Sequence, residues 1–135
     1  MRKEDIQNEI DSLIEKTLCG KHIYEKGKDF LEVVDGRRTS ITYSSSGQQE
    51  ALPLTIMLTA LPFFESRDSG QTVYIEEPEA HLFPDAQRNI IELIITIFNA
   101  RKKQPQFFIT THSQLTIYSK LGRSMKRLIK TFYLS

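Results

Sequence analysis

The sequence predicts an α/β fold built on a parallel βαβ core. Three stretches of the 135-residue chain carry this prediction: an apolar run at 73–75, an amphipathic segment at 84–102 and a second apolar run at 107–109. Short apolar runs bounded by turn signals are typical of buried strands. Two strands joined through a helix are parallel. The length suits one domain.

The composition is that of a globular protein without a strong charge bias. Hydrophobic residues make up 39% of the chain and charged residues 26%, and the formal net charge is +1. This balance gives no global argument for nucleic acid or a membrane as partner. A single Cys19 excludes an internal disulfide and fits a reducing compartment. No signal peptide and no membrane-length apolar stretch is recognisable, so we expect a cytoplasmic protein with no membrane partner.

An amphipathic helix is expected over residues 3–18, followed by short antiparallel strands. Gly20 is a candidate C-cap of the helix. Strands at 22–25 and 30–34 are expected to form a hairpin, with a third strand at 37–43.

The dipeptide Gly20-Lys21 is not the end of a phosphate-binding P-loop. That motif has a Gly five positions before its Gly-Lys and a Ser or Thr after it. Glu15 and His22 occupy these two positions here. The sequence therefore marks a helix end at this point.

Small hydroxyl residues at 44–46 precede a long apolar segment at 51–64. Such residues satisfy the free N–H groups at a helix start, and the same geometry favours a bound phosphate. Local sequence favours an ordinary cap over a phosphate site. We expect a buried helix here, kinked at Pro53 because proline removes a backbone hydrogen bond.

Two carboxylates, Glu76 and Glu77, end the first predicted buried strand. Carboxylates are costly in a dry core but are well placed at the carboxyl edge of a parallel sheet, where α/β proteins bind ligands. The second strand runs into His112. Because parallel strands bring their carboxyl ends to one edge, we expect all three side chains at the same edge.

The tail at 114–135 alternates basic and apolar residues and is expected to form a basic amphipathic helix. A solvated helix face is the favoured interpretation, with nucleic-acid contact as the alternative. The predicted organisation is a single partial domain. It has a helix and hairpin at 1–43, a core at 44–113 and this tail.

A hydrophobic strand that ends in two carboxylates is the Walker B arrangement. Phosphoryl transfer needs charge neutralisation and positioning of the attacking water, which two acids with different roles supply. A His on the neighbouring strand can donate a hydrogen bond to the γ-phosphate.

With these motifs the chain resembles the carboxyl-terminal half of an ABC-type ATPase domain. The likeness is to the ABC-like AAA ATPases grouped with overcoming-lysogenisation-defect nucleases, recombination-repair ATPases and structural-maintenance-of-chromosomes proteins. Residues 44–48 are similar to the signature Leu-Ser-Gly-Gly-Gln, 73–77 to Walker B, 79–85 to the D-loop and 109–113 to the switch loop. The resemblance covers roughly residues 40–113 and implies a partial P-loop NTPase fold.

The resemblance implies two ATPase heads that sandwich ATP and Mg²⁺ between them. Glu77 would be the catalytic carboxylate, Glu76 the acid on the Mg²⁺ side and His112 the γ-phosphate sensor. The signature residues that would contact the nucleotide of the partner head are Ser45, Ser46, Gly47 and Gln48. DNA is a further candidate partner, because the resembled families span DNA repair, phage defence and chromosome organisation.

The chain departs from these families in several respects. In the signature Ser44 and Ser46 replace Leu and Gly, and the segment after Ser113 has no likeness to them. Glu76 stands where Asp is more frequent, and no P-loop is present to hold the α- and β-phosphates. The chain alone is therefore expected to bind ATP poorly and to depend on a P-loop-bearing segment or subunit.

Two alternatives to an ATPase half-domain stay open. One is a non-catalytic interaction module or remnant of such an ATPase. The other is a metal-dependent hydrolase, although the sequence has no established ligand spacing. Its candidate ligands are Glu76, Glu77, Glu79, His81 and His112.

Overall fold

The computed structural model describes residues 3–61, 71–100, 106–112 and 129–132. Its helices are α1 (Lys3–Leu18), α2 (Ser46–Ala60) and α3 (Pro84–Ala100), with a short 3-10 helix η1 (Ile41–Tyr43). Its strands are β1 (Lys21–Glu25), β2 (Lys28–Glu32), β3 (Arg38–Ser40), β4 (Thr72–Glu76), β5 (Gln106–Thr110) and β6 (Ile129–Phe132).

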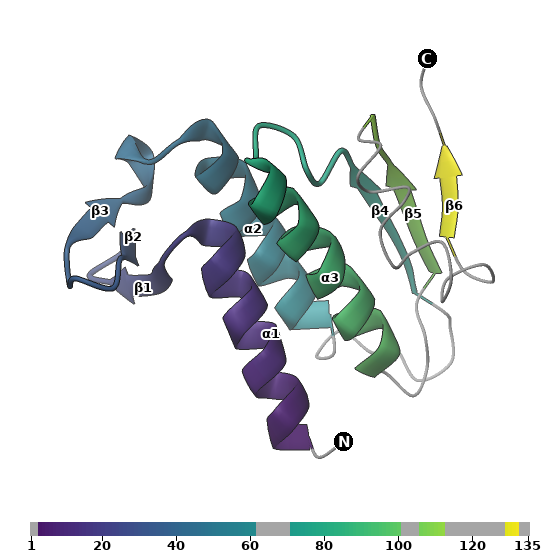
Figure 1. Ribbon diagram of the computed structural model, residues 1–135, viewed down its shortest axis with the longest axis horizontal. Coiled ribbons are helices and arrows are strands. Elements are labelled where there is room, and N and C mark those ends of the chain that lie inside the picture. The colour runs from purple at the N-terminus through teal and green to yellow at the C-terminus, as the bar shows by residue number, and fades with distance from the viewer. Residues whose placement is uncertain (1–2, 62–70, 101–105, 113–128, 133–135) are drawn as a thin grey trace.

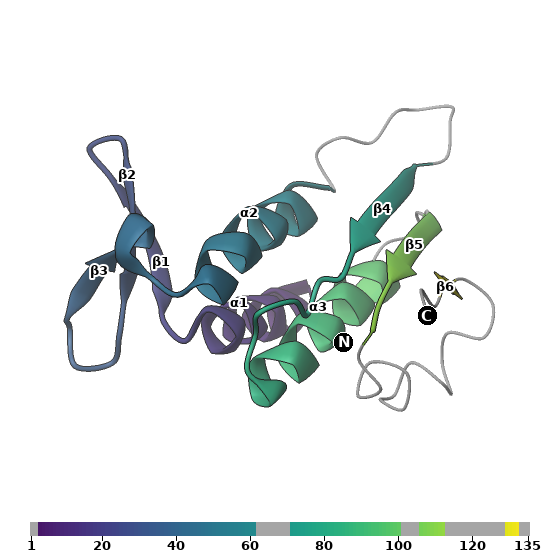
Figure 2. The same ribbon diagram turned by 90° about the horizontal axis from the view of Figure 1, so that it is seen from above.

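The helices lie between two small sheets at opposite ends of the molecule (Figures 1 and 2). One sheet is antiparallel with strand order β1-β2-β3, and the other is parallel with order β4-β5-β6. The α/β prediction, with a parallel βαβ core, an N-terminal helix and a small antiparallel unit, is confirmed. Among the described residues, no helix combines the length and apolar character needed to cross a membrane.

The main core fills the space between α1, α3 and one face of the parallel sheet. The apolar face of α3 is almost completely buried there. The ring of Phe98 packs edge-on against Phe107 of β5, with 5.9 Å between the ring centroids. The strand residues in this core are Val73, Ile75, Phe107 and Ile109. Their burial at every second position is the period expected of a strand with one covered face.

The opposite face of β4 and β5 carries an exposed tyrosine beside a partly buried phenylalanine, which the sequence did not predict. Tyr74 is 73% exposed and stacks on Phe108, with 5.0 Å between the ring centroids. The expectation that Val73-Tyr74-Ile75 is buried throughout is therefore wrong at Tyr74. An apolar run shows that a strand is compatible with burial on both faces but not that both faces are covered.

One prediction for α2 needs correction, that of its burial. The helix begins with Ser46 and continues through Pro53, which lies on its exposed side. Ile56 and Met57 are 47% and 37% exposed, so α2 is not buried all round as its apolar sequence suggested. Only one side of the helix meets the other helices, and this side carries Leu52 and Leu58.

The antiparallel sheet differs from the prediction in its turns. Lys26 and Gly27, both with positive φ (50° and 76°), form the whole hairpin loop, so β2 already starts at Lys28. Positive φ at both loop residues is the conformation that two-residue hairpins of type I′ need. The third strand ends at Ser40, and residues 41–43 form η1 instead of continuing it.

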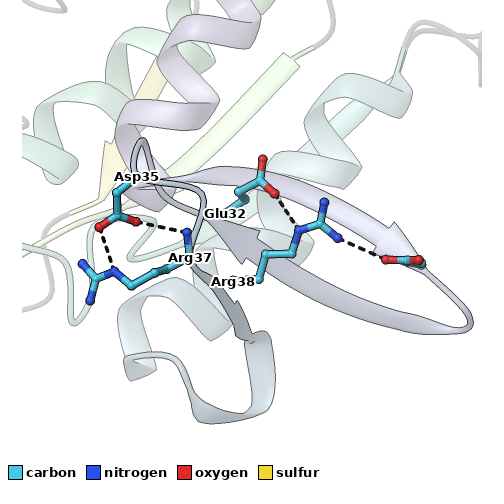
Figure 3. Close-up of polar contacts among 5 residues, drawn as sticks. Glu32, Asp35, Arg37 and Arg38 are labelled. Atoms are coloured by element: carbon cyan, nitrogen blue, oxygen red, sulfur yellow. Dashed lines mark hydrogen bonds and ion pairs between the residues drawn. The ribbon is translucent and has the colours of Figure 1, made fainter.

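Charged side chains of this sheet, and of the turn between β2 and β3, form ion pairs with one another (Figure 3). Arg38 donates to Glu32 at 2.5 Å and to Glu25 at 3.2 Å. The hydrogen bond with Glu32, and then its negative charge, raise the pKa of the Arg38 guanidinium. Arg37 pairs with Asp35 at 2.7 Å. Both arginines are thus engaged by carboxylates of the chain itself, Arg38 from β3 and Arg37 from the turn that precedes it.

The predicted tail helix is wrong for residues 129–132. These residues form β6, which pairs in parallel with β5, in a register that joins Phe107 to Ile129 and Thr110 to Phe132. Ile129, Thr131 and Phe132 are residue types that favour strands. The remaining tail residues, 113–128 and 133–135, lie outside the described part of the chain.

Helix α1 ends in a Schellman cap. The Gly20 amide donates to the Glu15 carbonyl at 3.0 Å, and Cys19 takes the left-handed conformation with φ 53°. The sequence placed the cap at Gly20, one residue too late. The left-handed position of this motif is usually glycine, because any β-carbon is strained there.

Replacing Cys19 with glycine is expected to raise the free energy of unfolding by up to about 1 kcal/mol, since it removes that strain. Urea denaturation measures the change. Cys19→Ala is the matched control, because it removes the thiol but keeps the β-carbon. An equal gain in both variants would show that the thiol, and not the backbone conformation, is responsible.

The start of α2 packs directly on the chain that follows β4. A β-carbon added at Gly47 would lie 2.4 Å from the His81 carbonyl oxygen and 3.0 Å from a methyl carbon of Leu82. A contact under 3.0 Å with a backbone oxygen requires the backbone to shift. Only glycine allows this approach.

Gly47→Ala is therefore expected to lower the free energy of unfolding by about 1–3 kcal/mol, the usual cost of overpacking. Chemical denaturation provides the measurement. Ser46→Ala is the control, because Ser46 is the neighbouring and exposed residue of the same helix turn. Equal stability of the two alanine variants would contradict the close approach.

Candidate functional site

Strand β4 delivers two carboxylates to the carboxyl edge of the parallel sheet. Glu76 is its last residue, is exposed, and stands opposite Thr110 of β5. Glu77 follows with a left-handed backbone (φ 42°), and its amide donates to the Thr110 carbonyl at 2.9 Å. The pairing of the two strands thus extends one residue further and fixes the backbone of Glu77.

The structure brings Glu77 and His112 together, as the parallel-strand argument predicts. His112 Nε2 lies 3.0 Å from Glu77 Oε1. Both side chains are only partly buried, with 55% of His112 and 43% of Glu77 exposed. A ligand can therefore reach the pair. The Glu77 carboxylate can accept a proton, and the His112 imidazole can donate a hydrogen bond to an anion.

The chain that follows Glu77 turns back into the protein. Pro78 and Glu79 are buried, and the Thr111 hydroxyl donates a hydrogen bond to Glu79. The sequence indicates for Glu79 only a place among candidate metal ligands or in the D-loop. Its role as an acceptor for Thr111 could not be found without knowing that the two segments meet.

His81 links this turn to α2. Its Nδ1 lies 3.0 Å from a carboxylate oxygen of Glu50, and its backbone has φ 58°. Together with the approach of Gly47 to its carbonyl group, this pair joins α2 to the post-β4 turn, residues 77–82. The turn therefore contacts both the end of β5 and the start of α2.

The signature-like residues form a capping box at the start of α2. The Ser45 hydroxyl accepts from the Gln48 amide at 3.3 Å, and Gln48 Oε1 accepts from the Ser45 amide at 3.0 Å. Gln48 Nε2 also donates to the Leu18 carbonyl at 2.8 Å, which fastens α2 to the end of α1. The Gln48 side chain is thus engaged within the fold. The Ser-x-x-Gln spacing was the signal for this role in the sequence.

A pocket of about 250 Å³ lies between α2 and the end of β4. Its apolar wall includes Leu54 and Met57 from α2 and Tyr74 from β4, while Glu76 and Glu77 line it with carboxylates. The two acids therefore face a space that a ligand can enter.

The carboxylates of Glu76 and Glu77 suit Mg²⁺ better than a metal ion such as Zn²⁺, which is held by three or more protein side chains. Mg²⁺ is usually held through one or two carboxylates, with waters and phosphate oxygens completing its shell. Glu76 and Glu77 offer such carboxylates. In the described ranges, no group of three or more His, Cys, Asp and Glu side chains could hold a metal ion. His81 pairs with Glu50 and Glu79 with Thr111, so the described part of the chain does not gather the five residues of the metal-hydrolase alternative around one point.

Comparison with known proteins identifies a family. No curated protein and no solved structure matches the chain. A family model described as AAA ATPase domain matches residues 2–117. The α/β architecture is consistent with a partial P-loop NTPase fold, and the family supports a general ATPase function with ATP and Mg²⁺. Because this match covers most of its length, the chain belongs to the AAA ATPase domain family.

Proposed function

We propose that the chain is the carboxyl-terminal part of an ABC-like ATPase head, related to the overcoming-lysogenisation-defect, recombination-repair and chromosome-maintenance ATPases. It contributes the signature, the Walker B carboxylates and the switch His to a composite ATP site. The observation that carries this proposal is the contact between Glu77 and His112 at the carboxyl edge of the parallel sheet.

In the proposed mechanism Glu77 is the catalytic carboxylate. It orients the attacking water and accepts its proton as the water oxygen bonds to the γ-phosphorus and the bond to the β–γ bridging oxygen breaks. His112, whose Nε2 lies 3.0 Å from Glu77, donates to a γ-phosphate oxygen from the same side in this proposal. The exposed position of Glu76 suits a Mg²⁺ ligand, and the ion would supply neutralisation of phosphate charge.

The start of α2 serves the nucleotide of a second head. Helix N-termini favour anions because their free N–H groups and the dipole both point at the ligand. Ser46 and Gly47 would present backbone N–H groups to the γ-phosphate, and Ser45 and Ser46 would add their hydroxyls; the Ser45 N–H itself donates to Gln48. We assign Gln48 a supporting part there, because its side chain completes the capping box and holds Leu18.

A P-loop-bearing segment or subunit completes the site in this proposal. Such a segment provides the backbone N–H groups and the Lys that hold the α- and β-phosphates. The parts at 1–43, 44–113 and 114–135 then belong to one partial domain of that larger head. DNA remains a candidate partner of the assembled ATPase, and a cytoplasmic location is part of the same proposal.

Glu77→Gln is expected to lower kcat for ATP hydrolysis by roughly 10²- to 10⁴-fold, the contribution usual for a positioned proton acceptor. The measurement is steady-state phosphate release by the chain assembled with its P-loop-bearing segment. ATP binding should persist, because the amide keeps the shape of the site. Glu9→Gln, at an exposed position on α1, is the matched control. Unchanged hydrolysis in Glu77→Gln would remove Glu77 from the mechanism.

A further inference from the structure

Glu79 is a buried carboxyl group to which the proposed mechanism gives no part. Only 5% of Glu79 and 1% of Thr111 is exposed, and the Thr111 hydroxyl donates to Glu79 Oε1. Burying a carboxyl group is unfavourable unless hydrogen bonds replace its water. The burial of the Glu79 carboxyl group in the turn after β4 therefore requires a structural explanation.

The position of the contact in the chain suggests the reason. Glu79 follows Glu77 by two residues, and Thr111 directly precedes His112. The same two segments are also joined by a backbone hydrogen bond, which the Glu77 amide donates to the Thr110 carbonyl at 2.9 Å. The contact therefore ties together the two short segments that carry Glu77 and His112.

The contact between Glu77 and His112 is too exposed to fix the positions of the two segments that carry them. Its side chains are 43% and 55% exposed, and exposed ion pairs contribute little to holding two segments together. The left-handed backbone of Glu77 adds strain that surrounding contacts must sustain. The buried Glu79–Thr111 bond lies where such support is required.

We propose that Glu79 and Thr111 are positioning residues that hold Glu77 and His112 in contact. The catalytic meaning of this positioning rests on the proposed function, but the positioning itself can be measured without ATP. Neither residue touches the reacting atoms in this account. They act through the backbone that joins each of them to the pair.

The first experiment measures amide hydrogen exchange by NMR on the full chain. Thr111→Val keeps the shape of the side chain and removes the donor, and it is expected to speed exchange of the Glu77 amide roughly tenfold. Thr111→Ser keeps the donor and is the matched control, with exchange close to that of the unmodified chain. Core amides of α3 report global stability in the same spectra.

A double variant separates positioning from folding. Replacing both partners of a buried hydrogen bond by apolar groups is often nearly neutral for stability. Glu79→Leu with Thr111→Val is therefore expected to fold and still to exchange the Glu77 amide as fast as Thr111→Val. The proposal is overturned if Thr111→Val and Thr111→Ser exchange alike at Glu77. It is also overturned if the Glu77 amide in the double variant stays as protected as in the unmodified chain.

The second experiment compares kcat and KM for ATP in the assembled ATPase. Thr111→Val should lower kcat roughly tenfold with KM unchanged, and Thr111→Ser should restore kcat. If the exchange results hold but no assembly hydrolyses ATP, the proposed function fails and the positioning stands. If hydrolysis depends on Glu77 yet both Thr111 variants are fully active, the positioning role fails and the proposed function stands.

Discussion

The parallel pairing of β4 with β5 is the constraint on which the rest of this structure depends. It sets Glu76 opposite Thr110 and lets the Glu77 amide bond to the next carbonyl group. Because both strands run the same way, their polar ends meet at one edge while their apolar residues share one core. A shift of this register by one residue would turn Val73 and Ile75 away from α3 and separate the site residues.

The second feature is the turn at 77–82, which joins the sheet edge to α2. It begins and nearly ends with left-handed residues that are not glycine, Glu77 and His81. The strained backbone is supported on one side by Thr110 and Thr111 and on the other by Glu50 and the close approach of Gly47. The start of α2 and the end of β4 are therefore parts of one packed unit, although about 30 residues separate Gly47 from Glu77 in the sequence.

Local patterns predicted the parallel βαβ core and the meeting of Glu77 with His112 at one sheet edge, because a βαβ unit leaves little freedom in placing these two residues. They could not show that Tyr74 is exposed, because the sequence of a strand does not indicate which of its two faces other elements cover. The contacts of Glu79 with Thr111 and of His81 with Glu50 depend on long-range packing, and no local pattern encodes them. A helix was predicted wrongly for residues 129–132, because the mixture of basic and apolar residues in the tail is also typical of an amphipathic helix.

The central claim is that Glu77 and His112 act as a unit on one ATP molecule. A double-mutant cycle on ATP hydrolysis, with Glu77→Gln, His112→Ala and the combined variant in the assembled ATPase, tests it most directly. Residues that act together give a combined loss of kcat close to that of the more damaging single variant. Losses that multiply, or single variants that hydrolyse ATP at the unmodified rate, would contradict the claim.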